Sequence, residues 1–180
     1  MTTLKSNGTQ EHTQTFQAHE GPAWQVSWAH PKYESVIASC GYDNKVKVWR
    51  RDQTGNWENV VFTETLSSSV NCIAWAPWEY GLILAAGTAE GIVHIFSRNP
   101  SDGNWAKQHF IAHQEGVNGL SWGPSTEPAI LSAKSVAGQS DKKFNLPPKR
   151  LATGGNDKFV KVWTFNSDSH DQKPQESVVG

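Results

Sequence analysis

Residues 38–49 read ASCGYDNKVKVW, and residues 152–163 read ATGGNDKFVKVW. In each segment a hydroxyl-bearing residue lies four positions before an aspartate, and a tryptophan lies six positions after that aspartate. Asp and Asn favour tight turns, and the valines between the turn and the tryptophan favour a strand. The two segments therefore predict two copies of one strand–turn–strand unit.

The repeat extends to a series of tryptophans at intervals of 47 residues, Trp28, Trp75 and Trp122. His19 and His113 each lie nine residues before the first and the third of these tryptophans. A period slightly above 40 residues that ends in a Trp–Asp type signature is typical of β-propeller blades. A closed propeller needs roughly 4–8 blades. The sequence therefore predicts an all-β fold of about three four-stranded blades in a partial, open ring.

Short runs of β-branched and aromatic residues mark the expected strands. In the first unit these are residues 23–28, 36–40, 45–49 and 57–62. In the second unit they are residues 70–75, 82–86, 92–96 and 105–111. No segment keeps a period of 3.6 residues, so no long helix is expected.

The repeats divide the chain into three units, residues 14–60, 61–108 and 109–165. Polar tails flank them at residues 1–13 and 166–180, and no fourth strand is expected after the third unit. Each unit is expected to form one blade of the partial ring.

The third unit carries a loop insertion at residues 125–150, because 35 residues separate Trp122 from Asp157 where 15 separate Trp28 from Asp43. Its basic side chains are Lys134, Lys142, Lys143, Lys149 and Arg150. A solvated loop and a weak basic contact for an acidic partner both fit this composition.

Composition limits the classes of function that fit the chain. Its 180 residues include 16 Lys and Arg against 17 Asp and Glu, which argues against a broad nucleic-acid-binding surface. No apolar run approaches the roughly 20 residues of a membrane helix, and residues 1–13 lack the apolar core of a signal peptide. We therefore expect a cytoplasmic or nuclear protein whose two cysteines, Cys40 and Cys72, are reduced thiols.

The repeats resemble the WD-repeat family over residues 16–165, nearly everything except the tails. In that family a His, a hydroxyl residue, an Asp and a Trp form one hydrogen-bonded structural set in each blade. The resemblance implies two such sets here: His19, Ser39, Asp43 and Trp49, then His113, Thr153, Asp157 and Trp163.

The second unit departs from this pattern at all four positions, which are Leu66, Ala86, Glu90 and Phe96. A half-satisfied buried network is less stable than an apolar replacement, so the four positions are expected to change together. Glu90 is the charged residue left over, and we expect it to face solvent.

A histidine, a serine and an aspartate are also the residues of a hydrolytic triad. The set recurs in two units, however, and active sites rarely occur as repeated copies in one chain. A zinc site made of His19, His113, Cys40 and Cys72 is disfavoured, because no CxxC or HxxxH spacing is present. The sequence therefore predicts no enzyme, no cofactor and no metal site. No role is predicted for three further histidines, His12, His94 and His170.

Longer stretches carry a closer resemblance. They are residues 19–31 (HEGPAWQVSWAHP), 37–43 (IASCGYD), 69–77 (SVNCIAWAP) and 80–85 (YGLILA). Together they are similar to the small β-propeller subunits shared by the COPII outer vesicle coat and the Y-shaped outer-ring complex of the nuclear pore. The resemblance covers what would be the second to fourth blades of such a subunit.

This resemblance implies a non-catalytic scaffold for protein–protein assembly in ER-to-Golgi vesicle transport. The implied partner is a large α-solenoid coat protein or nucleoporin that donates a further blade by strand addition. The implied locations are the cytoplasmic side of the ER membrane and the COPII coat, the nuclear pore and a lysosomal membrane complex. Membrane association would occur only through the coat, without direct nucleic-acid binding. Partner-contact residues are not predicted.

Two alternatives stay open, because a fold does not determine a function. The first is a generic WD-repeat adaptor that presents substrates or partners, for example to a ubiquitin ligase. The second is a truncated fragment of a larger ring with no function of its own, since an open arc leaves sheet edges exposed.

Overall fold

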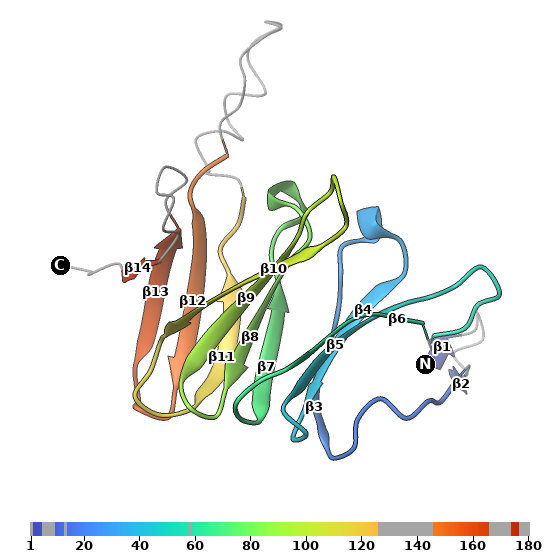
Figure 1. Ribbon diagram of the computed structural model, residues 1–180, viewed down its shortest axis with the longest axis horizontal. Helices are drawn as coiled ribbons and strands as arrows, with labels where there is room; N and C mark the ends of the chain where they lie inside the picture. The colour runs from blue at the N-terminus through green and yellow to red at the C-terminus, as the bar shows by residue number, and fades with distance from the viewer. Residues whose placement is uncertain are drawn as a thin grey trace, which may run out of the picture.

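The computed structural model describes residues 2–4, 10–12, 14–57, 59–125, 146–165 and 174–176, with side chains omitted for 2–4, 10–12 and 59. These residues form three four-stranded sheets, in which all neighbouring strands are antiparallel, and one two-stranded hairpin (Figure 1). The predicted all-β, partial propeller is confirmed, and none of the described sheets closes on itself. The described part of the chain contains no helix with the length and apolar character needed to span a bilayer.

Each sheet is one blade, and its strands follow chain order. Blade 1 consists of β3 (Ala23–Trp28), β4 (Val36–Gly41), β5 (Lys45–Arg50) and β6 (Asn59–Thr65). Blade 2 consists of β7 (Val70–Trp75), β8 (Ile83–Thr88), β9 (Ile92–Arg98) and β10 (Trp105–Ile111). Blade 3 consists of β11 (Val117–Trp122), β12 (Lys149–Gly155), β13 (Val160–Phe165) and β14 (Gln175–Glu176). Short 3-10 turns follow the first strands of blades 1 and 2, at η1 (Pro31–Tyr33) and η2 (Trp78–Tyr80).

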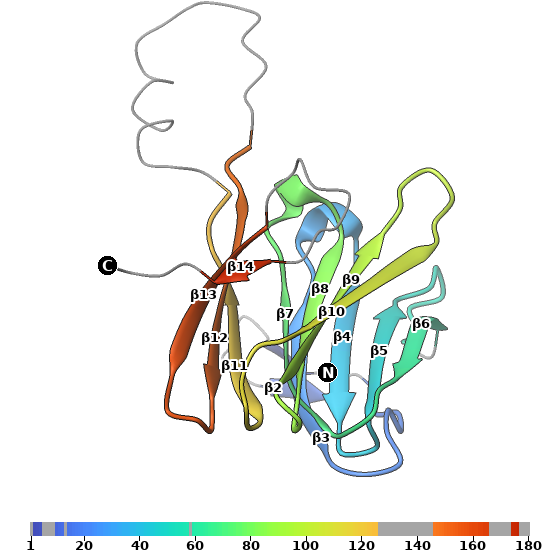
Figure 2. The same cartoon turned by 60° about the vertical axis from the view of Figure 1, so that its left-hand side comes forward.

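The three blades share one register, so equivalent residues can be matched between them. Trp28 pairs with Ile37, Trp75 with Leu84 and Trp122 with Leu151. The first strand of each blade is irregular at the same point, between Ala23 and Gln25 in β3 and at the matching positions of β7 and β11. The blades stand side by side in Figures 1 and 2, and neighbouring blades contact one another through these first strands.

The turns between the second and third strands also repeat. A residue with positive φ closes each turn: Asn44 at 63° in blade 1, Gly91 at 84° in blade 2 and Lys158 at 71° in blade 3. In blade 2 this residue must be glycine, because a Cβ on Gly91 would lie 2.1 Å from the backbone oxygen of His113. The turn of blade 2 therefore lies directly against the segment that leads into blade 3.

The hydrophobic core lies between the blades. One cluster joins blades 1 and 2 through residues such as Val48, Leu84 and Phe96, and a second joins blades 2 and 3 through Ile95 and Leu151. Blade 2 is covered on both faces, and all six residues of β8 are buried. Alternate side chains of a strand point to opposite faces, so β8 supplies both clusters and needs small residues such as its alanines.

The sequence predicted polar tails at the two ends of the chain, and the structure places a short strand pair or strand in each of them. At the N-terminal end, β1 (Thr2–Leu4) pairs with β2 (Gln10–His12). At the C-terminal end, β14 pairs with β13, so the prediction that no fourth strand follows the third unit is wrong. The two residues of β14 are both polar and exposed, and such a strand carries no hydrophobic alternation that a sequence pattern could detect.

The insertion of blade 3 is described only at its ends, because residues 126–145 lie outside the described part of the chain. Lys134, Lys142 and Lys143 fall in that range, so the predicted basic contact stays a prediction. Lys149 and Arg150 belong to β12 rather than to the loop where the sequence placed them. The hydroxyl of Tyr80 donates to the backbone oxygen of Pro147 at 3.1 Å, which ties the end of the insertion to blade 2.

Candidate functional site

Blade 1 brings its four polar candidates together. The Nδ1 atom of His19 lies 2.9 Å from Asp43 Oδ1, and its Nε2 atom lies 2.8 Å from the Ser39 hydroxyl. The indole N–H of Trp49 donates to the same hydroxyl at 2.9 Å. A neutral His19 with its proton on Nδ1 satisfies both neighbours, because it then donates to Asp43 and accepts from Ser39.

Blade 3 repeats this arrangement with a threonine in place of the serine. His113 Nδ1 lies 2.8 Å from Asp157 Oδ1, and His113 Nε2 lies 2.8 Å from the Thr153 hydroxyl. The indole N–H of Trp163 donates to that hydroxyl at 3.0 Å. Two sets 114 residues apart in sequence, as measured from Ser39 to Thr153, therefore share one geometry.

Asp43 holds the segment before β3 against the β4–β5 turn. Besides His19 it accepts the backbone N–H of Glu20 at 3.1 Å and that of Lys45 at 3.2 Å. Burial alone would raise the pKa of Asp43, but these N–H donors and the His19 ring together lower the pKa below its ordinary value. The carboxylate is therefore charged, and it links two parts of the chain that are distant in sequence.

Blade 2 holds an apolar version of the same site. Leu66, Ala86 and Phe96 occupy the equivalent positions and are all buried. Glu90 is exposed, in line with the prediction, and accepts a hydrogen bond from the Ser67 hydroxyl at 2.8 Å. The site can thus be built either with all of its polar partners or with none of them.

The His–Ser–Asp geometry resembles a hydrolytic triad, but the hydroxyl is enclosed. Ser39 is only 2% exposed and Thr153 only 1% exposed. Each hydroxyl already accepts an indole N–H, and its own proton points to the histidine. A catalytic nucleophile must reach the substrate, and neither hydroxyl can do so in this arrangement. The geometry fits a structural hydrogen-bond network that joins distant segments of the chain.

Metal ligands do not gather in the part of the chain that the structure describes. Within the described ranges, no three His, Cys, Asp or Glu side chains lie close enough together to hold a metal ion. His19 and His113 each face their own aspartate in separate blades. Cys40 and Cys72 are free, in line with the predicted reduced thiols, and both are buried.

Both cysteines are expected to resist thiol reagents in the folded protein. Burial raises the pKa of each of the two thiols to about 12, so almost none of the reactive thiolate is present near neutral pH. Titration with Ellman's reagent at pH 8 should detect no fast-reacting thiol in the native state. Both thiols should react in denaturant, which serves as the control for reagent and concentration. If one equivalent of thiol reacted rapidly in the native protein, at least one of the two cysteines would not be buried.

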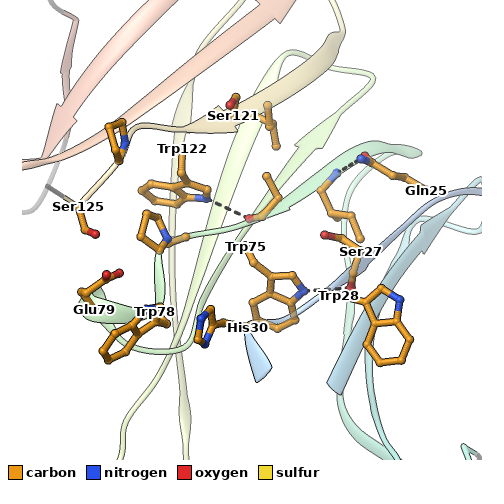
Figure 3. A pocket seen from close by; sticks show the side chains of 16 residues that line it. Gln25, Ser27, Trp28, His30, Trp75, Trp78, Glu79, Ser121, Trp122 and Ser125 are labelled. Atoms are coloured by element: carbon orange, nitrogen blue, oxygen red, sulfur yellow. Dashed lines mark hydrogen bonds between the residues drawn. The ribbon is translucent and has the colours of Figure 1, made fainter. Parts of the chain in front are cut away.

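An open groove crosses the first strands of all three blades, and we call it the axial groove (Figure 3). It has a volume of about 610 Å³. Its aromatic lining residues are Trp28, Trp75, Trp78 and Trp122. Its polar lining residues are Gln25, Ser27, His30, Glu79, Ser121 and Ser125. Because each blade contributes to it, the groove exists only when the repeats are stacked.

A ladder of indoles forms the floor of the axial groove and joins the blades. The indole N–H of Trp75 donates to the backbone oxygen of Ser27 at 3.1 Å, and that of Trp122 donates to the backbone oxygen of Ala74 at 3.0 Å (Figure 3). In addition, Gln25 Oε1 accepts the backbone N–H of Ile73 at 2.7 Å. The tryptophan period of 47 residues thus reflects one repeated contact between neighbouring blades.

The rim of the groove at η2 presents a partly exposed aromatic ring. Trp78 is 36% exposed, stacks on His30 with ring centroids 5.4 Å apart, and lies 4.3 Å from the Lys32 ammonium. The Tyr33 hydroxyl donates to the backbone oxygen of Trp78 at 3.1 Å and fixes η1 against η2. A tryptophan held in place beside polar groups is typical of protein interfaces, where such residues carry much of the binding energy.

Two features of the structure were not predicted from the sequence. Trp78 lies three residues beyond Trp75 and outside the 47-residue series, so the repeat alone does not single it out. His94 was assigned no role, but it is only 6% exposed and neither of its ring nitrogens has a hydrogen-bond partner among the residues that the structure describes. The signal for His94 was its alignment, because the equivalent positions two residues before Trp49 and Trp163 are lysines.

Comparison with known proteins agrees with this geometry. The family described as "WD domain, G-beta repeat" matches residues 10–50 and 105–164. The unmatched residues 51–104 contain the first three strands of blade 2, the blade without the polar set.

Individual relatives are similar over most of the chain. "Protein transport protein sec13" of Emericella nidulans is 34% identical over 181 residues, covering 96% of this chain and 55% of the relative. "Protein transport protein SEC13" of Coccidioides immitis is 36% identical over 162 residues, with coverages of 87% and 50%. "Protein SEC13 homolog" of Drosophila melanogaster is 40% identical over 154 residues, with coverages of 85% and 42%. The chain spans about half the length of the curated relatives it matches.

Proposed function

Because this chain belongs to the WD-repeat family, we propose that it is a non-catalytic scaffold that binds other proteins. The axial groove is the observation that carries this proposal. The polar residues that resemble a catalytic set are enclosed, whereas the aromatic and polar residues of the groove are open to a partner. Interfaces of this kind combine anchored aromatic rings with a polar rim.

The assembly proposed is a transport coat. Relatives with the name "protein transport protein" support a role in protein transport. The proposed setting is the COPII outer coat on the cytoplasmic side of ER membranes, and the outer ring of the nuclear pore. The proposed partner is a large α-solenoid coat protein or nucleoporin that donates a blade, and a lysosomal membrane complex is a further proposed setting. Contact with membranes would run through these partners.

A generic adaptor, for example for a ubiquitin ligase, is the second candidate. It rests on the same axial groove, because a groove of this type can present many partners. The two candidates differ in what they bind. A coat scaffold should recover a large α-solenoid protein from cell extract, and an adaptor should recover ligase components.

Co-purification with a groove variant tests the proposal. Trp78→Ala is expected to reduce recovery of the solenoid partner at least about fivefold, since removal of an aromatic residue that anchors an interface costs more than about 1 kcal/mol of binding energy. Tyr42→Ala is the matched control, because Tyr42 is 63% exposed and lies in the β4–β5 turn, outside the groove. Recovery should be read by quantitative mass spectrometry after thermal melting has shown both variants to be folded. Equal recovery with Trp78→Ala and Tyr42→Ala would contradict partner binding at the groove.

A further inference from the structure

The boundary between blades 1 and 2 contains a second hollow, which we call the boundary hollow. It has a volume of about 140 Å³. Val36 and Val48 of blade 1 line it on one side, and Leu82 and Trp105 of blade 2 line it on the other. Its lining residues and those of the axial groove do not overlap. The boundary hollow is therefore a separate site, formed by two blades that are in contact with each other.

The equivalent place between blades 2 and 3 is filled by an aromatic ring of the chain itself. Phe165 lies two residues after Trp163, as Arg98 lies two residues after Phe96, and these two strands have the same register in their blades. Alternate residues of a strand face the same side, so Phe165 and Arg98 each face the preceding blade. Phe165 is only 6% exposed and belongs to the core between blades 2 and 3. Arg98 is exposed at the rim and leaves the boundary hollow open.

An irregularity in β6 adds an apolar residue to the rim of the boundary hollow. Val48 pairs with Phe62 and Trp49 pairs with Val60, so Val61 is an extra residue in this strand. Such a bulge changes the direction of a side chain. Val61 is 42% exposed and lines the hollow, where a bound side chain can contact it.

Both charged residues that line the boundary hollow are arginines, Arg50 and Arg98. The Arg98 guanidinium lies against Gly103, where an added Cβ would be 3.1 Å from Nη2, and its side chain has no hydrogen bond or ion pair with a described residue. Arg50 lies 3.1 Å from the carboxylate of Glu34, whose side chain is 75% exposed. An ion pair this exposed contributes little stability, so Arg50 can exchange Glu34 for another carboxylate. The rim is therefore complementary to acidic groups.

We propose that the boundary hollow binds a short segment of a partner protein in which acidic residues flank a phenylalanine. Its volume is far below the roughly 300–1,000 Å³ of small-molecule pockets, which favours a single side chain as the occupant. The phenylalanine follows from Phe165, which fills the equivalent place between blades 2 and 3. The acidic residues follow from the two arginines at the rim. This site goes beyond the proposed function, because it does not require the axial groove.

Peptide titration of the 180-residue chain tests the proposal. The probe is a fluorescently labelled peptide, Gly-Ser-Glu-Phe-Glu-Ser-Gly, and fluorescence polarisation reports its binding. We expect saturable binding that becomes at least about tenfold weaker in Arg98→Glu, because like charges across an interface oppose association. Arg51→Glu is the matched control and should bind as the unaltered chain does. Arg51 is the equivalent arginine of blade 1, donates to the backbone oxygen of Gly55 at 3.1 Å and lies outside the hollow. Both arginines are exposed, and circular dichroism should show unchanged strand content in both variants.

Two altered peptides separate the parts of the contact. A peptide with alanine in place of phenylalanine should bind the unaltered chain at least about tenfold more weakly, because it lacks the side chain that fills the hollow. A peptide with lysine in place of both glutamates should bind Arg98→Glu more tightly than it binds the unaltered chain. This exchange distinguishes a local charge pair from a general effect of net charge.

The location of the peptide is read from the indole N–H signals in heteronuclear NMR spectra. The Trp105 signal should shift on addition of the phenylalanine peptide, and that of Trp57, its equivalent in blade 1, should not. Trp78→Ala should leave peptide binding unchanged, so this proposal and the one for the axial groove fail independently. The proposal is overturned if the phenylalanine peptide does not bind, if Arg51→Glu weakens binding as much as Arg98→Glu, if the alanine peptide binds equally well, or if the Trp105 signal does not move.

Discussion

Replacing His113 with leucine is expected to lower the free energy of unfolding by about 3 kcal/mol, because it leaves buried polar partners unpaired. His113 is only 1% exposed, and both of its ring nitrogens are bonded, one to Asp157 and the other to Thr153. Leucine has a similar volume, so the loss comes from hydrogen bonds rather than from a cavity. Urea denaturation followed by tryptophan fluorescence measures the change.

A concerted replacement provides the control for this result. Blade 2 shows that leucine is acceptable when the whole set changes with it, as Leu66, Ala86 and Phe96 are all buried there. We expect the combined variant His113→Leu, Thr153→Ala, Asp157→Glu and Trp163→Phe to be more stable than the sum of the four single changes predicts. Full additivity of the four losses would show that the residues act independently, contrary to a shared network.

Acid is expected to weaken the contact between blades 1 and 2 through His94. Burial, together with the nearby Lys107 and His109, lowers the pKa of His94 to about 4, against an opposing effect of Glu64. The lower pKa means that the folded protein holds His94 neutral, whereas the unfolded chain binds a proton below about pH 6.5. Stability from this group is therefore complete above about pH 6.5 and is lost as the pH falls towards about 4. A shift of this size corresponds to about 3 kcal/mol.

His94→Leu isolates this effect. Neither ring nitrogen of His94 is hydrogen-bonded within the described part of the chain, so leucine should leave stability at pH 7 unchanged or slightly higher. Between about pH 6.5 and 4 the variant should lose about 3 kcal/mol less stability than the unaltered chain. His30→Gln is the control, because it removes one exposed imidazole and leaves His94 in place. Parallel pH profiles for His94→Leu and the unaltered chain would contradict a neutral, buried His94.

The fold was predictable from the sequence because its repeat is anchored by large residues at fixed intervals. Trp28, Trp75 and Trp122 occupy equivalent positions at the ends of β3, β7 and β11, and the expected strands of the first two blades are all present. Strand boundaries were less predictable. The fourth strand of blade 1 was expected to begin at Trp57, but β6 begins at Asn59, because the buried Trp57 packs edge-on against Trp28 instead.

The candidate site was only partly predictable, because a pattern shows recurrence and not spatial contact. The recurrence of His19, Ser39 and Asp43 as His113, Thr153 and Asp157 pointed to the two polar sets. By contrast, the carbonyl oxygens that receive the indoles carry no side-chain signal, since Ser27 and Ala74 differ in type. The alignment of His94 with two lysines marks it as a departure from the repeat, but its burial depends on blade 1 packing against it, which the pattern does not show.

Hydrogen exchange of the indole N–H groups, followed by heteronuclear NMR, tests the stacked-blade arrangement most directly. Each indole proton reports on one contact, and the Trp75 and Trp122 protons are bonded across neighbouring blades. Both should exchange at least about tenfold more slowly than that of the partly exposed Trp78, which donates no hydrogen bond to a described residue. If the Trp75 and Trp122 protons exchanged as fast as that of Trp78, the blades would not be joined in this way, and the axial groove would not form.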